Sequence, residues 1–190
     1  VERSRGLGDV YKRQVLLLST IFLMIIIAGA KLKHIVISFL LLSSSFIFLI
    51  FAAPYRMKRL MAFLNPYEDP HGTGYQIIQS FVSFANGQFF GVGLGNSSQK
   101  LFFLPQGHND FIFSIIAEEL GFAGCLFTIF LFLILFYSIL KILKRSKDLF
   151  SKYLISAILI ITTIQVIINI SVSVGLMPTK GVPLPLISYG

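Results

Sequence analysis

Four long stretches of this chain carry no charged side chain, and this feature constrains its fold more than any other. They cover residues 15–30, 35–53, 120–140 and 153–177. A helix needs roughly 20 apolar residues, at about 1.5 Å rise each, to cross a bilayer core. Because backbone in lipid must satisfy its own hydrogen bonds, we expect four transmembrane helices, although a buried helix is an alternative for the short first stretch. The expected fold is an all-α, polytopic transmembrane helix bundle.

The excess of positive charge, +8 at neutral pH, fits cytoplasmic loops of a membrane protein better than nucleic-acid binding. The first fourteen residues, "VERSRGLGDVYKRQ", are polar and end abruptly at the first apolar run. They are either a basic cytoplasmic end or translated sequencing-adaptor sequence. We interpret residues 1–14 as non-native and base the fold on residues 15–190. The single cysteine, Cys125, excludes a disulfide framework and a thiolate metal site.

Basic residues indicate which side of the membrane each loop occupies. Two turns between consecutive spans fall on one side, with Lys31, Lys33, Lys141, Lys144, Arg145, Lys147 and Lys152. The other side carries Arg56, Lys58, Arg59, Lys100 and Lys180. Seven cations against five favour the first side as the cytoplasm. The loop over residues 54–109 and the tail after residue 177 are therefore predicted to lie outside.

The outer loop is predicted to carry its own helix. Ile77, Ile78, Phe81, Val82 and Ala85 recur at helical spacing, while Gln76, Gln79, Ser80 and Ser83 fall elsewhere on the wheel. This pattern predicts an amphipathic helix at the outer membrane interface, or a short helix packed on the bundle. Three glycines follow in "GVGLGNSSQK". They form either a flexible turn or a loop whose backbone N–H groups face a phosphate.

Polar residues gather in "LPQGHNDFIFSIIAEELG" at the start of the third span, which we place over residues 111–140. Thirty helical residues extend about 45 Å, more than the hydrocarbon core, so Asp110 is predicted at the outer interface. Glu118 lies about 80° round a regular helix from Asp110 and about 12 Å along it, so the two carboxylates could share a cavity without touching. Glu119 lies on the opposite face.

Each of these residues also has a purely structural interpretation. Asp110, like Asn109, suits a helix N-cap. Glu118 and Glu119 face either a polar cavity or a Lys or Arg of a neighbouring helix, since carboxylates are costly in a span. His108 either tunes the site or is solvated. Lys180 lies in a tail broken by glycines and prolines, where it meets either an anionic headgroup or ordinary solvent.

Three long motifs resemble the SEDS family of membrane proteins (FtsW, RodA and SpoVE), and its FtsW branch most of all. The motifs are "APYRMKRLMAFLNPYEDPHGTGYQIIQS", "GVGLGNSSQKLFFLPQGHNDFIFSIIAEELG" and "GLMPTKGVPLPLISYG". The family has ten spanning helices, so the resemblance implies that residues 15–190 are a C-terminal part of the SEDS membrane domain. Two departures are visible: Asn109 stands where the family usually has Thr, and Gln106 replaces a common Glu.

The resemblance implies a peptidoglycan glycosyltransferase in the bacterial cytoplasmic membrane, active on its outer face at the division septum. It would polymerise lipid II, with divisome proteins and a class B penicillin-binding protein as partners. The family's essential acid falls on Asp110, with the implied role of general base toward the acceptor sugar hydroxyl. An ordinary Asp, with a pKa of about 3.9, is ionised at neutral pH.

The leaving group would be undecaprenyl diphosphate, whose charge requires cations. Lys180, Lys100 and Arg56 are the candidates, with His108 and Glu118 as further substrate-binding residues. No metal-ligand spacing is present in the sequence, but a divalent cation (Mg or Mn) near Asp110 is a candidate cofactor. Alternative functions are a lipid II flippase, a non-catalytic divisome scaffold, and a RodA-like elongation or SpoVE-like sporulation polymerase.

Overall fold

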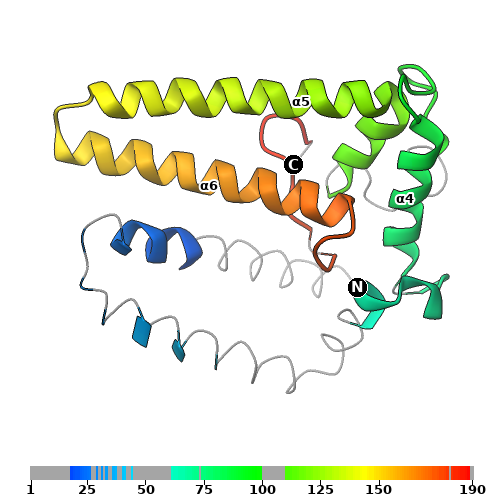
Figure 1. The fold of residues 1–190 in the computed structure, drawn as a ribbon, viewed down its shortest axis with the longest axis horizontal. Coiled ribbons are helices and arrows are strands. Elements are labelled where there is room, and N and C mark those ends of the chain that lie inside the picture. The colour runs from blue at the N-terminus through cyan, green and yellow to red at the C-terminus, as the bar shows by residue number, and fades with distance from the viewer. Residues whose placement is uncertain are drawn as a thin grey trace, which may run out of the picture.

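Two long antiparallel helices and a third helix across their end make up most of the structure (Figure 1). The computed structural model describes residues 18–26, 29, 31, 33, 36–37, 40–41, 44, 61–72, 74–99, 110–179 and 181–188. The labelled elements are the 3₁₀ turn η1 (Pro66–Glu68), α4 (Tyr75–Gly87), α5 (Ile112–Arg145) and α6 (Leu149–Ser173). The described part of the chain contains no strand, in agreement with the predicted all-α class.

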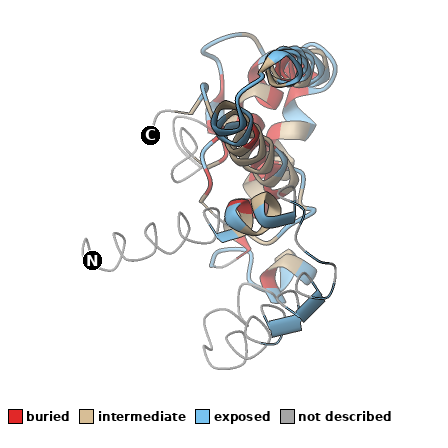
Figure 2. Ribbon diagram, turned by 90° about the vertical axis from the view of Figure 1, so that its left-hand side faces the viewer, coloured by how far each residue is buried: buried red, intermediate tan, exposed pale blue. Residues whose placement is uncertain are grey.

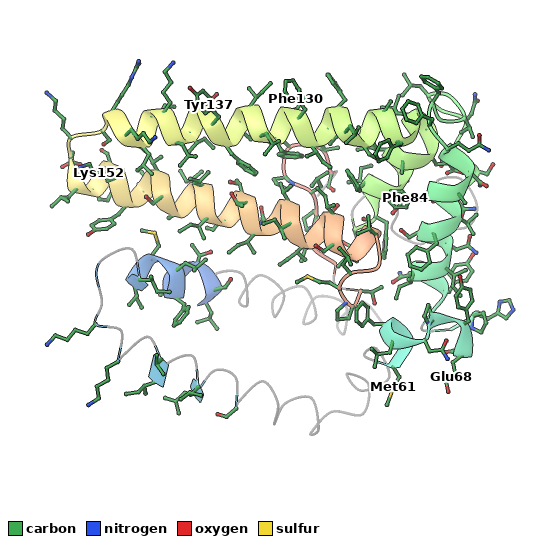
Figure 3. All side chains as sticks on the ribbon, viewed as in Figure 1. Met61, Glu68, Phe84, Phe130, Tyr137 and Lys152 are labelled. Atoms are coloured by element: carbon green, nitrogen blue, oxygen red, sulfur yellow. The ribbon has the colours of Figure 1, made fainter. Side chains whose placement is uncertain are left out.

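Helices α5 and α6 are long and apolar enough to cross a membrane, by length and composition. Many large apolar side chains of α5 are exposed, including Phe130 at 57% and Tyr137 at 68%. Figure 3 shows both pointing away from α6, as lipid-facing side chains do. Residues 18–26 of the first predicted span are helical, whereas most of the second, 35–53, lies outside the described residues. The boundaries of the four spans remain predictions.

The turn between α5 and α6 gathers the basic residues at one end of the bundle. Lys144 and Arg145 occupy the last turn of α5, where cations complement the helix dipole. Asp148 caps α6 by accepting a hydrogen bond from Ser151 N at 3.0 Å. This backbone bond lowers the pKa of the exposed Asp148 carboxyl below its ordinary value. Lys152 lies at the same end in Figure 3.

The sequence predicted one regular helix after Asp110, and this prediction is wrong at Gly121. The backbone there has φ 68° and ψ −166°, which is not helical. A short first segment, residues 112–120, therefore folds back beside the long second segment, residues 122–145, as Figure 1 shows. The second segment alone is about 36 Å long and suffices to cross a hydrocarbon core of about 30 Å.

The loop after α4 satisfies the backbone groups that this break exposes. Four hydrogen bonds join them: Phe122 N to Gln88 O (2.9 Å), Ala123 N to Phe89 O (3.1 Å), Val92 N to Glu118 O (2.9 Å) and Gly93 N to Glu119 O (3.0 Å). A helix end in lipid needs such partners, because no water replaces them. Since the N–H groups of Val92 and Gly93 are used within the fold, this part of the glycine loop is neither a phosphate cradle nor a free turn.

The predicted helix in the outer loop is present as α4, and its buried face consists mostly of small residues. The buried residues are Ile77, Ser80, Ser83 and Gly87. Ile78 and Phe81 belong to the apolar face that was predicted to meet either the membrane interface or the bundle, and they are half-buried, whereas Ala85 is exposed. Small residues allow close helix packing in membranes, where hydrophobicity does not distinguish lipid from protein. Figure 2 shows exposed and intermediate residues beside the buried ones on the helices.

Candidate functional site

Asp110 lies directly before α5, at the end of the bundle away from the basic turn. Helix α5 begins at Ile112 with Phe111 in the N-cap position, and no side chain caps it. Asp110 is therefore not the N-cap, and that structural interpretation is wrong. Phe111 is buried against Val172 of α6, which fixes the backbone beside Asp110. Asp110 itself is half-buried.

A buried asparagine of α6, Asn169, holds the backbone at Asp110. Its Nδ2 donates to Asp110 O at 2.9 Å and to Val182 O at 2.8 Å. Asn169 is 1% exposed and Val182 is 3% exposed. One side chain thus joins α6, the start of α5 and the C-terminal tail. Sequence reasoning missed Asn169, although an amide inside an apolar span is costly unless it is paired, and this was the available signal.

The tail is packed into the groove between α5 and α6. Leu184 is fully buried and contacts Phe132 and Val166 in one apolar cluster. A local turn closes beyond it, in which Ser188 Oγ accepts from Leu184 N at 2.9 Å. These contacts hold the segment around Val182 next to Asn169.

Three buried serines join α4, α5 and α6 close to this point. Ser80 Oγ donates to Ser173 O at 2.6 Å, so its only hydrogen is used. Ser114 Oγ lies 2.6 Å from Ser80 Oγ and must therefore be the donor of that pair. Ser173 Oγ in turn donates to Asn169 O at 2.9 Å. A continuous polar chain thus runs from the first turn of α5 through α4 to Asn169.

Glu118 lies in a separate, buried polar environment. Its carboxylate accepts hydrogen bonds from Ser97 Oγ, from Gln99 N at 3.4 Å and from Asn86 Nδ2 at 3.5 Å. Glu118 is 1% exposed. These donors come from α4 and from the segment that leads to Lys100, so the carboxylate anchors that segment. This geometry favours a positioning role for Glu118 over direct contact with substrate.

Replacing Glu118 by Ala is expected to lower the free energy of unfolding by about 2–4 kcal/mol, since it strands buried donors worth about 1–3 kcal/mol each. The largest part of this free-energy cost comes from the hydroxyl of Ser97, which is fully buried. The matched control is Glu68→Ala, which removes an exposed carboxylate of η1. Thermal unfolding in detergent measures both. Equal melting temperatures for the two variants would contradict the anchoring role.

The other predicted substrate-binding residues, Arg56, Lys100, His108 and Lys180, lie outside the described residues. Their roles therefore remain predictions. The residues that the structure describes include no group of three or more His, Cys, Asp or Glu side chains suited to a metal ion. The Glu118 carboxylate is engaged by protein donors. Residues 100–109, directly before Asp110, lie outside the described residues, so a divalent cation near Asp110 remains a prediction.

Comparisons with known proteins agree with one another. The model of a family of cell cycle proteins, FtsW/RodA/SpoVE, matches residues 9–190. The chain is 44% identical to the stage V sporulation protein E of Bacillus subtilis over 174 residues, covering 92% of this chain and 48% of that protein. It is 45% identical to a probable peptidoglycan glycosyltransferase FtsW of Coxiella burnetii over 179 residues, covering 93% of this chain and 48% of that one.

The chain is also similar in structure to a solved protein. In work on the structural coordination of polymerization and crosslinking by a peptidoglycan synthase complex, one chain superposes with a TM-score of 0.70 and 29% identity. The match covers 93% of the present chain and 48% of that chain. The present chain spans about half the length of the curated relatives it matches.

Proposed function

This chain belongs to the FtsW/RodA/SpoVE family of cell cycle proteins, and from that membership we propose that it is part of a peptidoglycan glycosyltransferase that polymerises lipid II. Such a protein is integral to the membrane, as the two long apolar helices α5 and α6 indicate. Asp110 acts as the general base. It takes the proton from the acceptor sugar hydroxyl as that oxygen attacks the anomeric carbon of the donor, and the polyprenyl diphosphate leaves.

The observation that supports this role is the way the backbone at Asp110 is held. Phe111 is buried on α6, and Asn169 binds the carbonyl of Asp110 itself. A general base works by lying within hydrogen-bond reach of the proton it removes, and it typically contributes about 10²–10⁴-fold to the rate. A fixed backbone limits the positions its carboxylate can adopt, which is what such a reaction requires.

The segment that carries the candidate cation for the leaving group is held at the same place. Lys180 precedes Val182 by two residues, and Val182 is bound by the same Asn169 amide. A cation near the departing diphosphate stabilises the charge that develops there. Lys100 similarly follows Gln99, whose backbone N–H is bound by Glu118. We assign Lys180 and Lys100 to the diphosphate groups on this basis.

The two ends of the bundle fit a reaction on the outer face. The basic turn between α5 and α6 belongs on the cytoplasmic side by the positive-inside tendency. Asp110 lies at the other end, where lipid II in the outer leaflet presents its sugars. We place the protein at the division septum with a class B penicillin-binding protein as partner. Identities of 44% to a sporulation protein and 45% to an FtsW do not separate these two branches.

The direct test uses the full-length protein that contains this sequence, reconstituted in sealed liposomes with lipid II. Glycan polymer is expected to appear on gels as a ladder. A scaffold would give no polymer and leave lipid II where it was. A flippase would change the accessibility of the lipid II headgroup across the vesicle wall without polymer. Either of these two outcomes would contradict the proposed activity.

A further inference from the structure

Asn169 lies where two functional segments meet, and nothing else in its own helix explains its presence there. It is 1% exposed and lies near the C-terminal end of an apolar helix. Both of its Nδ2 hydrogens are used, one on Asp110 O and one on Val182 O. Neither acceptor belongs to α6. The side chain therefore contributes to the placement of other segments and not to the stability of its own helix.

The orientation of this amide is forced by its surroundings. Both neighbouring groups are backbone carbonyls, which accept hydrogen bonds and cannot donate them. Only the NH₂ end of the amide can face them, so rotating the amide by 180° would place two oxygens against two oxygens. Among the described residues, Asn169 Oδ1 has no hydrogen-bond partner. The amide is thus held in place by its two donors alone.

Resting on the proposed function, we infer that Asn169 is a positioning residue that sets the distance between the general base Asp110 and the tail carrying Lys180. Its two hydrogen bonds fix both segments to one point on α6. The first end is reinforced by Phe111 packed on Val172. The second is reinforced by Leu184 packed on Phe132 and Val166. If either bond is lost, the position of the base relative to the segment that carries the leaving-group cation is no longer fixed.

Loss of the Asn169 amide should affect kcat more than KM. In the full-length protein, Asn169→Ala is expected to lower kcat for lipid II polymerisation about 10- to 100-fold, because misplacing a catalytic group by about 1 Å has an effect of that size. KM for lipid II should change less than about threefold, since Asn169 does not touch the substrate. The matched control is Thr162→Val, which removes a hydroxyl from α6 that bonds only within its own helix, to Ile158 O and Leu159 O.

Two further substitutions, Asn169→Asp and Asn169→Gln, distinguish a positioning role of Asn169 from a role in folding. Asn169→Asp keeps the shape but places a carboxylate against two carbonyls, so it should be as impaired as Asn169→Ala at neutral pH. When that carboxyl is protonated it regains one donor, so its activity relative to the wild type should rise as the pH falls. Asn169→Gln keeps both donors and should retain more activity than Asn169→Ala.

The double variant Asp110→Ala with Asn169→Ala shows through which residue Asn169 acts. Its residual rate should fall below that of Asp110→Ala by less than the roughly 10- to 100-fold effect of Asn169→Ala alone, because an absent base cannot be misplaced whereas the tail carrying Lys180 still can. If Asn169→Ala polymerises at the wild-type rate while Asp110→Ala does not, the positioning role fails and the general base survives. If Asp110→Ala itself is fully active, the general-base assignment fails and this inference fails with it, whereas absence of polymer from the wild type would contradict the proposed function. If all three Asn169 variants fail to insert, Asn169 serves folding and the inference is overturned.

Discussion

Full-length protein carrying Asp110→Ala is expected to insert into the membrane normally and to make glycan from lipid II about 10²–10⁴ times more slowly than the wild type. The reason is chemical. Without a base at this position, the acceptor hydroxyl must lose its proton to water while it attacks the donor. Asp110→Asn should lose as much, because an amide has nearly the shape of the carboxylate but cannot accept the proton. The measurement is the initial rate of polymer formation in liposomes.

Asp148→Asn is the matched control for loss of a carboxylate. Asp148 lies at the opposite end of the bundle, where it caps α6 in full solvent, and Asn is an equally good capping residue. Its rate should equal that of the wild type. Polymerisation at the wild-type rate by Asp110→Asn would rule out Asp110 as the base and leave it, at most, a structural role.

Gly121→Ala is expected to lower the free energy of unfolding by about 2–6 kcal/mol. A backbone with φ 68° and ψ −166° is essentially restricted to glycine, and a non-glycine residue there costs about 1–3 kcal/mol. In addition, the new Cβ would lie 2.6 Å from the carbonyl carbon and oxygen of Phe89. Overpacking of this kind costs about another 1–3 kcal/mol.

Gly95→Ala separates these two causes. Gly95 also has a positive φ, 81°, but a Cβ there would meet no atom within 4 Å. Its cost should be that of the backbone conformation alone, about 1–2 kcal/mol. Thermal unfolding of both variants in detergent provides the comparison. Equal destabilisation by the two substitutions would show that the loop over residues 88–93 does not pack against the helix break as described.

The sequence predicted the secondary structure well where it depends on local composition. The apolar run over 153–177 is largely α6, and the helical periodicity after Tyr75 is α4. The break at Gly121 could not be predicted, because glycine also occurs inside regular transmembrane helices. It depends on four hydrogen bonds from a loop about 30 residues earlier. The sequence left open whether the apolar face of α4 meets the membrane interface or the bundle, because apolar side chains in a membrane protein can face lipid as readily as protein.

The site was predictable only as far as its motifs extend. The resemblance identified Asp110 and the segments around it, but neither spacing nor composition indicated what holds them. Asn169 lies 59 residues from Asp110, and Ser80 lies 93 residues from Ser173. Contacts at such separations follow from the packing of α5 on α6 and of α4 across both. The buried environment of the Glu118 carboxylate is another example, since its donors come from the glycine-rich segment and from α4.

Asp110 must face the extracytoplasmic side of the membrane for the proposed reaction, and chemical labelling tests this placement most directly. A cysteine at position 110 of the full-length protein, in a background without other cysteines, is exposed to a membrane-impermeant maleimide from each face of sealed vesicles. The native Cys125 of this chain is removed for this purpose. We expect labelling of position 110 from the outer face, and labelling of a Lys147→Cys control from the cytoplasmic face. Labelling of position 110 only from the cytoplasmic face would contradict the account.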